Sequence, residues 1–282
     1  MSLKTTLIDV DALAALSADD VLIVDCRFEL SAPDKGARDY AQGHVPGAVY
    51  ASLDHDLSDL SRQGHGLGRH PLPLESAFSA LLSRWGWHVG LQVVAYDAAG
   101  GALAAARLWW LLRLAKVPAA VLDGGYAAWI AAGKPVEQGE PLSRPPTDVS
   151  LRYDASQVVL DHDAVAGGAS GQLLDARGAP RYRGDVEPLD RAAGHVPGAL
   201  NRPFADNLDG EGRFKPAAQL RDEFVAVLGD TPAGNVVHMC GSGVTACHNL
   251  LAMEHAGLHG SRLYAPSWSG WVSDPARPVA KG

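Results

Sequence analysis

Cysteine is scarce in this sequence: its 282 residues include only Cys26, Cys240 and Cys247. An odd number of cysteines at no paired spacing argues against a disulfide framework. No Cys-x-x-Cys pair occurs and the eleven histidines show no ligand spacing, so we expect no metal site. The cysteines are left for packing or for thiol chemistry in a reducing compartment.

Long apolar runs and excess basic charge are also missing. No apolar stretch approaches the roughly 18 residues that a membrane span needs, and the N-terminal segment lacks the uncharged core of a secretory signal. The formal net charge of -8 gives no general attraction to nucleic acid or anionic lipid. We therefore expect a cytoplasmic protein with no nucleic-acid or membrane partner, in which local groups hold any anionic ligand.

The sequence does contain ample material for hydrophobic cores, with 47% hydrophobic and 20% charged residues. It also contains a repeat. In the first half "VDCR" precedes "GHVPGAVY", and in the second half "LDAR" precedes "GHVPGALN". The offset is 150 residues from Asp25 to Asp175 and 151 from His44 to His195. The two landmarks thus keep nearly the same spacing in both halves.

Two more landmarks follow in the same order, a strand-like run starting at Gln92 or at Asn235 and a closing apolar strand with tryptophan. We infer two homologous domains of about 140 residues each. The first covers residues 1–134 and the second residues 151–282. The proline-rich, polar segment 135–150 between them reads as a linker.

Short β-rich apolar runs such as "VLIVD", "QVVAYD" and "NVVHMC" alternate with helical patterns such as "ESAFSALLSRWG" and "TACHNLLAMEHAG". Buried strands of this kind are typical of parallel sheets. The alternation predicts an α/β fold in which each domain is a mainly parallel sheet flanked by helices.

Cys240 follows a predicted strand, and "GSGVT" comes next. Ligands of open α/β sheets gather at the carboxyl ends of strands. We expect Gly241 and Gly243 to adopt conformations closed to other residues, which would turn backbone N–H groups inward as far as Val244 and Thr245, near the start of the next helix. These donors favour a negative charge on sulfur, hence a thiolate nucleophile.

An inert core cysteine is the competing interpretation of Cys240, and it is the preferred one for Cys247, which falls inside the predicted helix. The repeat offers an internal control. The first half carries Asp97 at the position of Cys240, and its loop "DAAGGA" has no nucleophile. We therefore expect one catalytic domain and one inactive domain.

These residues resemble the tandem-domain sulfurtransferases, a family that includes rhodanese and 3-mercaptopyruvate sulfurtransferase. The resemblance covers nearly the whole chain and is carried by both "GHVPGA" segments, "DARGAPRYRGD" and "CGSGVTAC". It implies two rhodanese-like domains, a persulfide on Cys240, an anionic sulfur donor, and cyanide or a thiol as acceptor. It also implies double-displacement kinetics without a cofactor.

The neutral Gly241 and Ser242 resemble the loop of 3-mercaptopyruvate enzymes, whereas thiosulfate-preferring members often carry cations there. The family arginine that holds the donor carboxylate falls on Arg181. Arg191 is the nearest candidate for a second substrate arginine, and Arg183 is an alternative.

The resemblance also implies that Ser242 donates to the substrate in a Ser, His, Asp arrangement, with His44 and Asp34 as partners. Because His195 repeats the same motif, a structural role for His44 stays open. Trp268 and Trp271 are candidates for the pocket wall or for the core.

Two other classes of protein were weighed. A cysteine phosphatase needs an arginine six residues after the cysteine, where this chain has Ala246. A binding module without catalysis is disfavoured by Cys240 and Arg181. Within the enzyme class, transfer from thiosulfate to cyanide is the alternative to 3-mercaptopyruvate.

Overall fold

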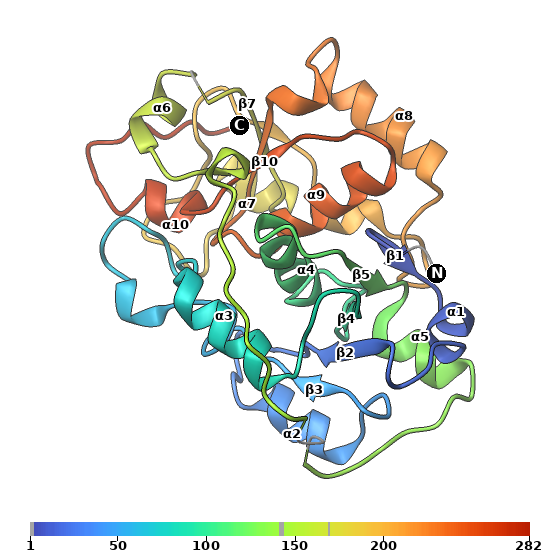
Figure 1. Cartoon of the computed structure of the whole chain (residues 1–282). Coiled ribbons are helices and arrows are strands. Elements are labelled where there is room, and N and C mark those ends of the chain that lie inside the picture. The colour runs from blue at the N-terminus through green and yellow to red at the C-terminus, as the bar shows by residue number, and fades with distance from the viewer. Residues whose placement is uncertain (1–2, 141–143, 169) are drawn as a thin grey trace. The chain divides into compact units, whose positions relative to one another are not determined.

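A computed structural model describes residues 3–140, 144–168 and 170–282 of the chain. The chain divides into two compact units (Figure 1). Unit 1 comprises residues 1–59, 72–154 and 210–214, and unit 2 comprises residues 60–71, 155–209 and 215–282. The units therefore do not follow the halves of the sequence, because the segment 60–71 packs with unit 2 and the segment 210–214 packs with unit 1.

Unit 1 alternates strands and helices, as the apolar runs predicted. Its strands are β1 (Leu7–Ile8), β2 (Val21–Asp25), β3 (Val49–Tyr50), β4 (Gln92–Tyr96) and β5 (Ala119–Leu122). Its helices are α1 (Val10–Ala14), α2 (Lys35–Gln42), α3 (Glu75–Arg84), α4 (Ala105–Leu114) and α5 (Gly125–Ala131). The five strands form a parallel sheet in the order β1-β5-β4-β2-β3.

Unit 2 repeats this plan. Its strands are β6 (Val158–Val159), β7 (Gln172–Asp175), β8 (Leu200–Asn201), β9 (Val236–Met239) and β10 (Arg262–Tyr264). Its α-helices are α6 (His162–Ala166), α7 (Ala179–Arg183), α8 (Ala217–Leu228), α9 (Ala246–His255) and α10 (Ser267–Trp271), and short 3-10 turns lie at Leu60–Arg62, Ala155–Gln157, Phe204–Asn207 and Ala233–Asn235. The parallel sheet has the equivalent order β6-β10-β9-β7-β8. The predicted α/β fold, with a parallel sheet flanked by helices in each of two repeated units, is confirmed.

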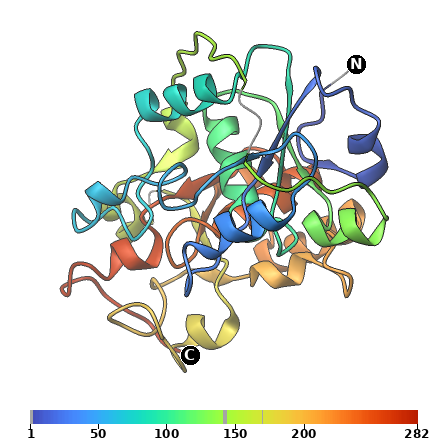
Figure 2. The same cartoon turned by 90° about the horizontal axis from the view of Figure 1, so that it is seen from below.

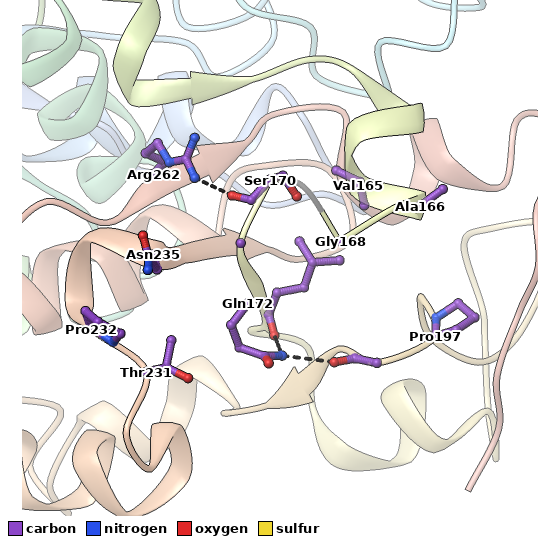
Figure 3. A pocket seen from close by; sticks show the side chains of 13 residues that line it. Val165, Ala166, Gly168, Ser170, Gln172, Pro197, Thr231, Pro232, Asn235 and Arg262 are labelled. Atoms are coloured by element: carbon purple, nitrogen blue, oxygen red, sulfur yellow. Dashed lines mark hydrogen bonds between the residues drawn. The ribbon is translucent and has the colours of Figure 1, made fainter.

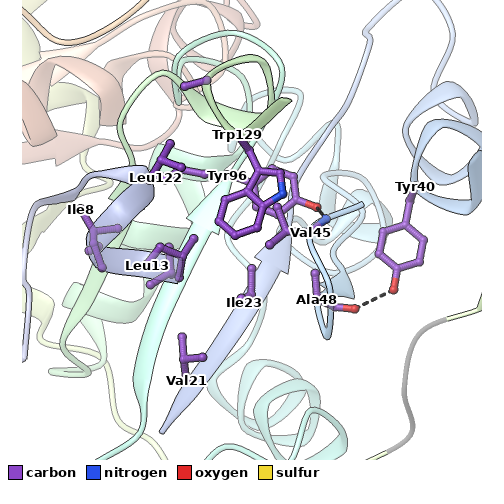
Figure 4. Close-up of a cluster of buried hydrophobic side chains, with 14 residues drawn as sticks. Ile8, Leu13, Val21, Ile23, Tyr40, Val45, Ala48, Tyr96, Leu122 and Trp129 are labelled. Atoms are coloured by element: carbon purple, nitrogen blue, oxygen red, sulfur yellow. Dashed lines mark hydrogen bonds between the residues drawn. The ribbon is translucent and has the colours of Figure 1, made fainter. Parts of the chain in front are cut away.

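Helices cover both faces of each sheet. In unit 1 a buried cluster joins Val10 and Leu13 of α1, Tyr40 of α2 and Trp129 of α5 to one face (Figure 4). Helices α1 and α5 accordingly lie together in both views of the chain (Figure 2). Helix α4 packs against β4 and β5. Burial on two faces explains why the central strands β2 and β4 are buried at every position.

The expected linker lies partly outside the described residues, at 141–143. The rest of it contacts unit 1. Glu137 exchanges two backbone hydrogen bonds of 2.9 Å with His44, and the N–H of Thr147 donates to the carbonyl of Ser83 at 3.2 Å. The domain bounds taken from the repeat remain a prediction.

Helix ends follow the local sequence. Helix α3 ends at Arg84, and Gly86 follows with a φ of +69°, a conformation that suits glycine after a helix. Helix α9 begins at Ala246, two residues after the start expected near Val244, so the loop after Cys240 is longer than the pattern indicated.

Candidate active site

Cys240 follows the last residue of β9, at the carboxyl edge of the unit 2 sheet. Its N–H donates to Oγ of Ser267 at 3.1 Å, and its carbonyl accepts from the N–H of Trp268 at 2.9 Å. The next carbonyl, that of Gly241, accepts from the N–H of Ser269 at 2.9 Å. The start of α10 therefore fixes the backbone that carries the buried thiol.

The loop between Cys240 and α9 presents backbone donors. Gly243 has a φ of +77°, as its glycine predicted. The N–H groups of Ser242, Val244 and Thr245 make no hydrogen bond within the described part of the chain. Successive free N–H groups around one position form a site for a negative charge.

Gly241 differs from the expectation, because its φ is not in the left-handed region. The structure gives another reason for glycine here. A Cβ at Gly241 would lie 3.0 Å from Nη2 of Arg69 and 3.6 Å from Nη1 and Nη2 of Arg181. The missing side chain leaves room for two guanidinium groups beside the nucleophile.

Arg181, on α7, is oriented by two carboxylates. Its Nε donates to Oε2 of Glu187 at 3.2 Å, and its Nη2 donates to Oε1 of Glu187 at 2.6 Å and to Oδ2 of Asp190 at 3.3 Å. Burial would raise the pKa of Glu187, but hydrogen bonds from Arg181 and from two backbone N–H groups outweigh it and lower the pKa. Glu187 is therefore ionised and fixes the guanidinium group.

The sequence analysis missed Arg69 and His70. Both lie in the segment 60–71 of unit 2. Nδ1 of His70 is 2.8 Å from Oγ of Ser242, and both residues are buried. Arg69 forms an ion pair with Asp190. The signal that could have found them is the run "GHGLGRH", in which every second residue before Arg69 is glycine.

Ser242 belongs to unit 2, and the histidine expected beside it, His44, does not. His44 belongs to unit 1, where its ring stacks on Tyr40 with centroids 3.8 Å apart and its Nδ1 lies 2.8 Å from the Tyr40 carbonyl. His195 repeats this arrangement on Tyr182, at 3.8 and 2.9 Å. The repeated geometry supports the structural interpretation of this histidine.

The other candidate residues are Asp34, Arg191 and Arg183. Asp34 precedes α2 in unit 1. Nη1 of Arg191 donates to the carbonyl of Val272 at 2.9 Å, and Nη2 of Arg183 pairs with the exposed Asp185 at 2.6 Å. None of these contacts joins Arg191 or Arg183 to the Cys240 loop within the described residues.

Trp268 and Trp271 are fully buried and belong to the core, so they present no surface to a ligand. The guanidinium group of Arg177 lies 4.6 Å above the Trp268 ring and is paired with Asp175 at 2.6 Å. The Arg27 and Asp25 pair of unit 1 has the same N–O distance. These are repeated structural pairs, as the sequence indicated.

A separate cavity of about 600 Å³ lies at the amino ends of the unit 2 strands (Figure 3). Two of its polar side chains bond within the protein: the Gln172 amide donates to the carbonyls of Leu173 and Gly198, and Arg262 donates to the carbonyl of Ser170. The described residues that line it include no cysteine, histidine or acid. The chemistry therefore belongs to the Cys240 loop.

Neither a metal-binding cluster nor a membrane-spanning helix occurs among the described residues. No group of three or more His, Cys, Asp or Glu side chains there is arranged to hold a metal ion. Likewise, none of the helices in this part of the chain has the length and apolarity to cross a bilayer.

Comparison with known proteins adds a family to this geometry. The rhodanese-like domain model matches residues 9–132 and again residues 161–274. The chain is 49% identical, over 95% of both chains, to the Pseudomonas aeruginosa protein named "Probable 3-mercaptopyruvate sulfurtransferase". It is 40% identical, over 94% of its own length and 93% of the other, to a Mycobacterium tuberculosis protein provisionally named thiosulfate sulfurtransferase SseB.

Solved structures agree. The 3-mercaptopyruvate sulfurtransferase from Leishmania major superposes with a TM-score of 0.84 at 34% identity, covering 94% of this chain and 73% of that one. SseA from Escherichia coli superposes with a TM-score of 0.79 at 31% identity, covering 94% of this chain and all of the other. With two copies of the domain matched in one polypeptide and similarity along nearly its whole length, this chain belongs to the tandem rhodanese-domain sulfurtransferase family.

Proposed function

We propose that the enzyme transfers sulfane sulfur from 3-mercaptopyruvate, through a persulfide on Cys240, to cyanide or a thiol acceptor. The observation that carries this proposal is the guanidinium group of Arg181 beside a neutral loop, 3.6 Å from the Cβ position of Gly241. A monoanionic 2-oxo acid needs a cationic clamp for its carboxylate, and the loop residues Gly241 and Ser242 add no charge of their own beside the nucleophile. The names of the Pseudomonas, Leishmania and Escherichia coli relatives support the same donor.

In the first half-reaction the Cys240 thiolate attacks the donor sulfur. An S–S bond forms while the C–S bond breaks, and the electron pair leaves as the enolate of pyruvate, which then takes a proton at carbon. Negative charge develops on the 2-oxo oxygen during this step. The hydroxyl of Ser242, hydrogen-bonded to His70, is the group proposed to donate to that oxygen.

In the second half-reaction the acceptor attacks the outer sulfur and the Cys240 thiolate is restored. Between the two steps the N–H groups of Ser242, Val244 and Thr245 would stabilise the electron-rich outer sulfur. The same loop thus serves thiolate and persulfide. Double-displacement kinetics follow, and neither a metal nor an organic cofactor enters any step.

Thiosulfate is the competing donor, and the name of the Mycobacterium tuberculosis relative favours it. The neutral residues Gly241 and Ser242 argue against a preference for a small dianion. A phosphatase reaction has no support in the loop, because Ala246 stands six residues after Cys240.

The deciding experiment compares kcat/KM for 3-mercaptopyruvate and for thiosulfate with the same acceptor. We expect 3-mercaptopyruvate to be the better donor by about tenfold, roughly the value of one hydrogen bond, because thiosulfate has no 2-oxo oxygen to accept from Ser242. A higher kcat/KM for thiosulfate would overturn the donor assignment. We also propose that the enzyme works in the cytoplasm, a reducing compartment in which cysteines stay as thiols, as the three cysteines are here.

A further inference from the structure

We infer that Arg69 is a second donor-binding residue, and that its guanidinium group and that of Arg181 together hold the carboxylate of the donor above Gly241. The inference rests on the proposed function. It assigns to Arg69 the role expected of Arg191, whose Nη1 donates to the carbonyl of Val272.

The two guanidinium groups converge on one point of the loop. Nη2 of Arg69 lies 3.0 Å from the Cβ position of Gly241, and both terminal nitrogens of Arg181 lie 3.6 Å from it. Gly241 directly follows the nucleophile. An anion held between the two groups would therefore present its reactive end to Cys240.

Asp190 keeps these two like charges together. One of its carboxylate oxygens accepts from Nη1 of Arg69 and the other accepts from Nη2 of Arg181. The Asp190 side chain is only 5% exposed, so water screens these contacts weakly. Asp190 offsets much of the repulsion between the two cations, and their remaining N–H donors can still attract an anion bound beside them.

Arg69 has donor capacity left for such an anion. A guanidinium group carries five N–H donors, and the Nη1 of Arg69 serves Asp190. Its Nε is buried and has no hydrogen-bond partner among the described residues. An unmet donor of this kind is costly unless a ligand satisfies it.

The backbone places Arg69 firmly. Its N–H donates to Oγ of Ser269 at 3.0 Å, next to the loop contacts of α10. Gly68 has a φ of +84°, and a Cβ there would come within 2.4 Å of the Pro266 carbonyl. The carbonyl of Gly66 accepts from Nε2 of His162 at 2.9 Å. The glycine run therefore allows the close approach that brings Arg69 to the loop.

The test uses two donors that differ only in the carboxylate: 3-mercaptopyruvate and 1-mercapto-2-propanone, in which a methyl group replaces it. We expect Arg69→Gln to lower kcat/KM for 3-mercaptopyruvate about 10- to 100-fold, the range for one charged hydrogen-bonding contact, and to leave 1-mercapto-2-propanone within twofold. Arg181→Gln should show the same selective loss. Arg221→Gln, an exposed arginine of α8, is the matched control and should change neither rate.

The outcomes separate the two proposals. If the wild-type enzyme prefers thiosulfate, the proposed function fails regardless of the variant. If the wild type prefers 3-mercaptopyruvate and Arg69→Gln keeps its rate, or loses both 2-oxo thiols equally, Arg69 does not bind the carboxylate and this inference is overturned. Should Arg69→Gln not fold by thermal melting, Arg69→Lys decides the matter, because it keeps the charge but loses the fork and should give a partial, donor-selective loss.

Discussion

The loops after β4 and β9 occupy equivalent places in the two units and differ at their first residue. Asp97 follows β4 and Cys240 follows β9. The carbonyl of Asp97 accepts from the N–H of Tyr126 at 3.0 Å, just as that of Cys240 accepts from Trp268 at 2.9 Å. The two loops therefore share this backbone hydrogen bond and differ in the side chain of their first residue.

In unit 1 the loop closes around its own anion. The fully buried carboxylate of Asp97 accepts five backbone hydrogen bonds of 2.8 to 3.1 Å, from Ala99, Gly101, Leu103, Ala104 and Ala105. A loop at this position can therefore gather N–H donors around a negative charge. In unit 2 the equivalent loop carries the sulfur of Cys240 in place of this carboxylate.

The surroundings of the two loops also differ in charge. Tyr40 and Tyr182 mark equivalent positions, since each hydroxyl donates at 2.6 Å to the carbonyl of the alanine in its "GHVPGA" segment. The residue before Tyr40 is Asp39, whereas the residue before Tyr182 is Arg181. Unit 1 therefore carries an acid where unit 2 carries the arginine proposed to bind the donor.

Removing the thiol of Cys240 is expected to have the largest effect on activity. Cys240→Ser should lower kcat/KM for every donor by at least about 10³-fold, because a hydroxyl is a far weaker nucleophile and cannot form a persulfide. Steady-state assays and mass spectrometry of the persulfide check this. Cys247→Ser is the control and should keep most of the activity; the reverse pattern would sink the site assignment.

Asp97→Asn tests whether unit 1 depends on its internal anion. The amide N–H₂ would face backbone N–H groups, so we expect the free energy of unfolding to fall by about 3 to 4 kcal/mol. Urea denaturation measures it. Sulfur transfer by the folded variant should persist, and an unchanged denaturation midpoint would contradict the account of this loop.

His238 of unit 2 is expected to make the protein sensitive to acid. It is fully buried in β9 where unit 1 has Ala95, and burial lowers its pKa from 6.5 to about 3. Below pH 6.5 the unfolded chain binds a proton that the folded chain does not, so this residue should remove about 3 kcal/mol of stability between pH 7 and pH 4. His238→Leu should flatten the pH dependence of unfolding by that amount, and an unaltered slope would refute the assignment.

Substitution of His70 is expected to lower kcat, whereas substitution of His44 is expected to lower the stability. His70→Ala should lower kcat about tenfold, because the Ser242 hydroxyl loses its hydrogen-bond partner. His44→Ala should leave kcat near the wild-type value and lower the melting temperature, as should His195→Ala. A kcat loss with His44→Ala and none with His70→Ala would restore His44 as the partner of Ser242.

Much of the molecule was predictable because its signals are local. The repeat, the strand and helix alternation and the contrast between Asp97 and Cys240 can all be read from neighbouring residues and their spacing. Arg181 was found through its place in a family motif. His44 was chosen through the family resemblance, and the repetition of its motif and of its stacking at His195 supports a structural role for it.

The sequence by itself determined two α/β domains and one cysteine that can act as a nucleophile, since periodicity and turn residues encode these features locally. Which side chains surround that cysteine depends on tertiary contacts between residues far apart in the sequence. Arg69 and His70 lie about 170 residues before the loop, in a segment with no marked counterpart in the second half, yet that segment packs into unit 2. Packing of Gly68 against Pro266 and of Arg69 against Ser269 brings them there, and such distant contacts leave no periodic trace in a single sequence.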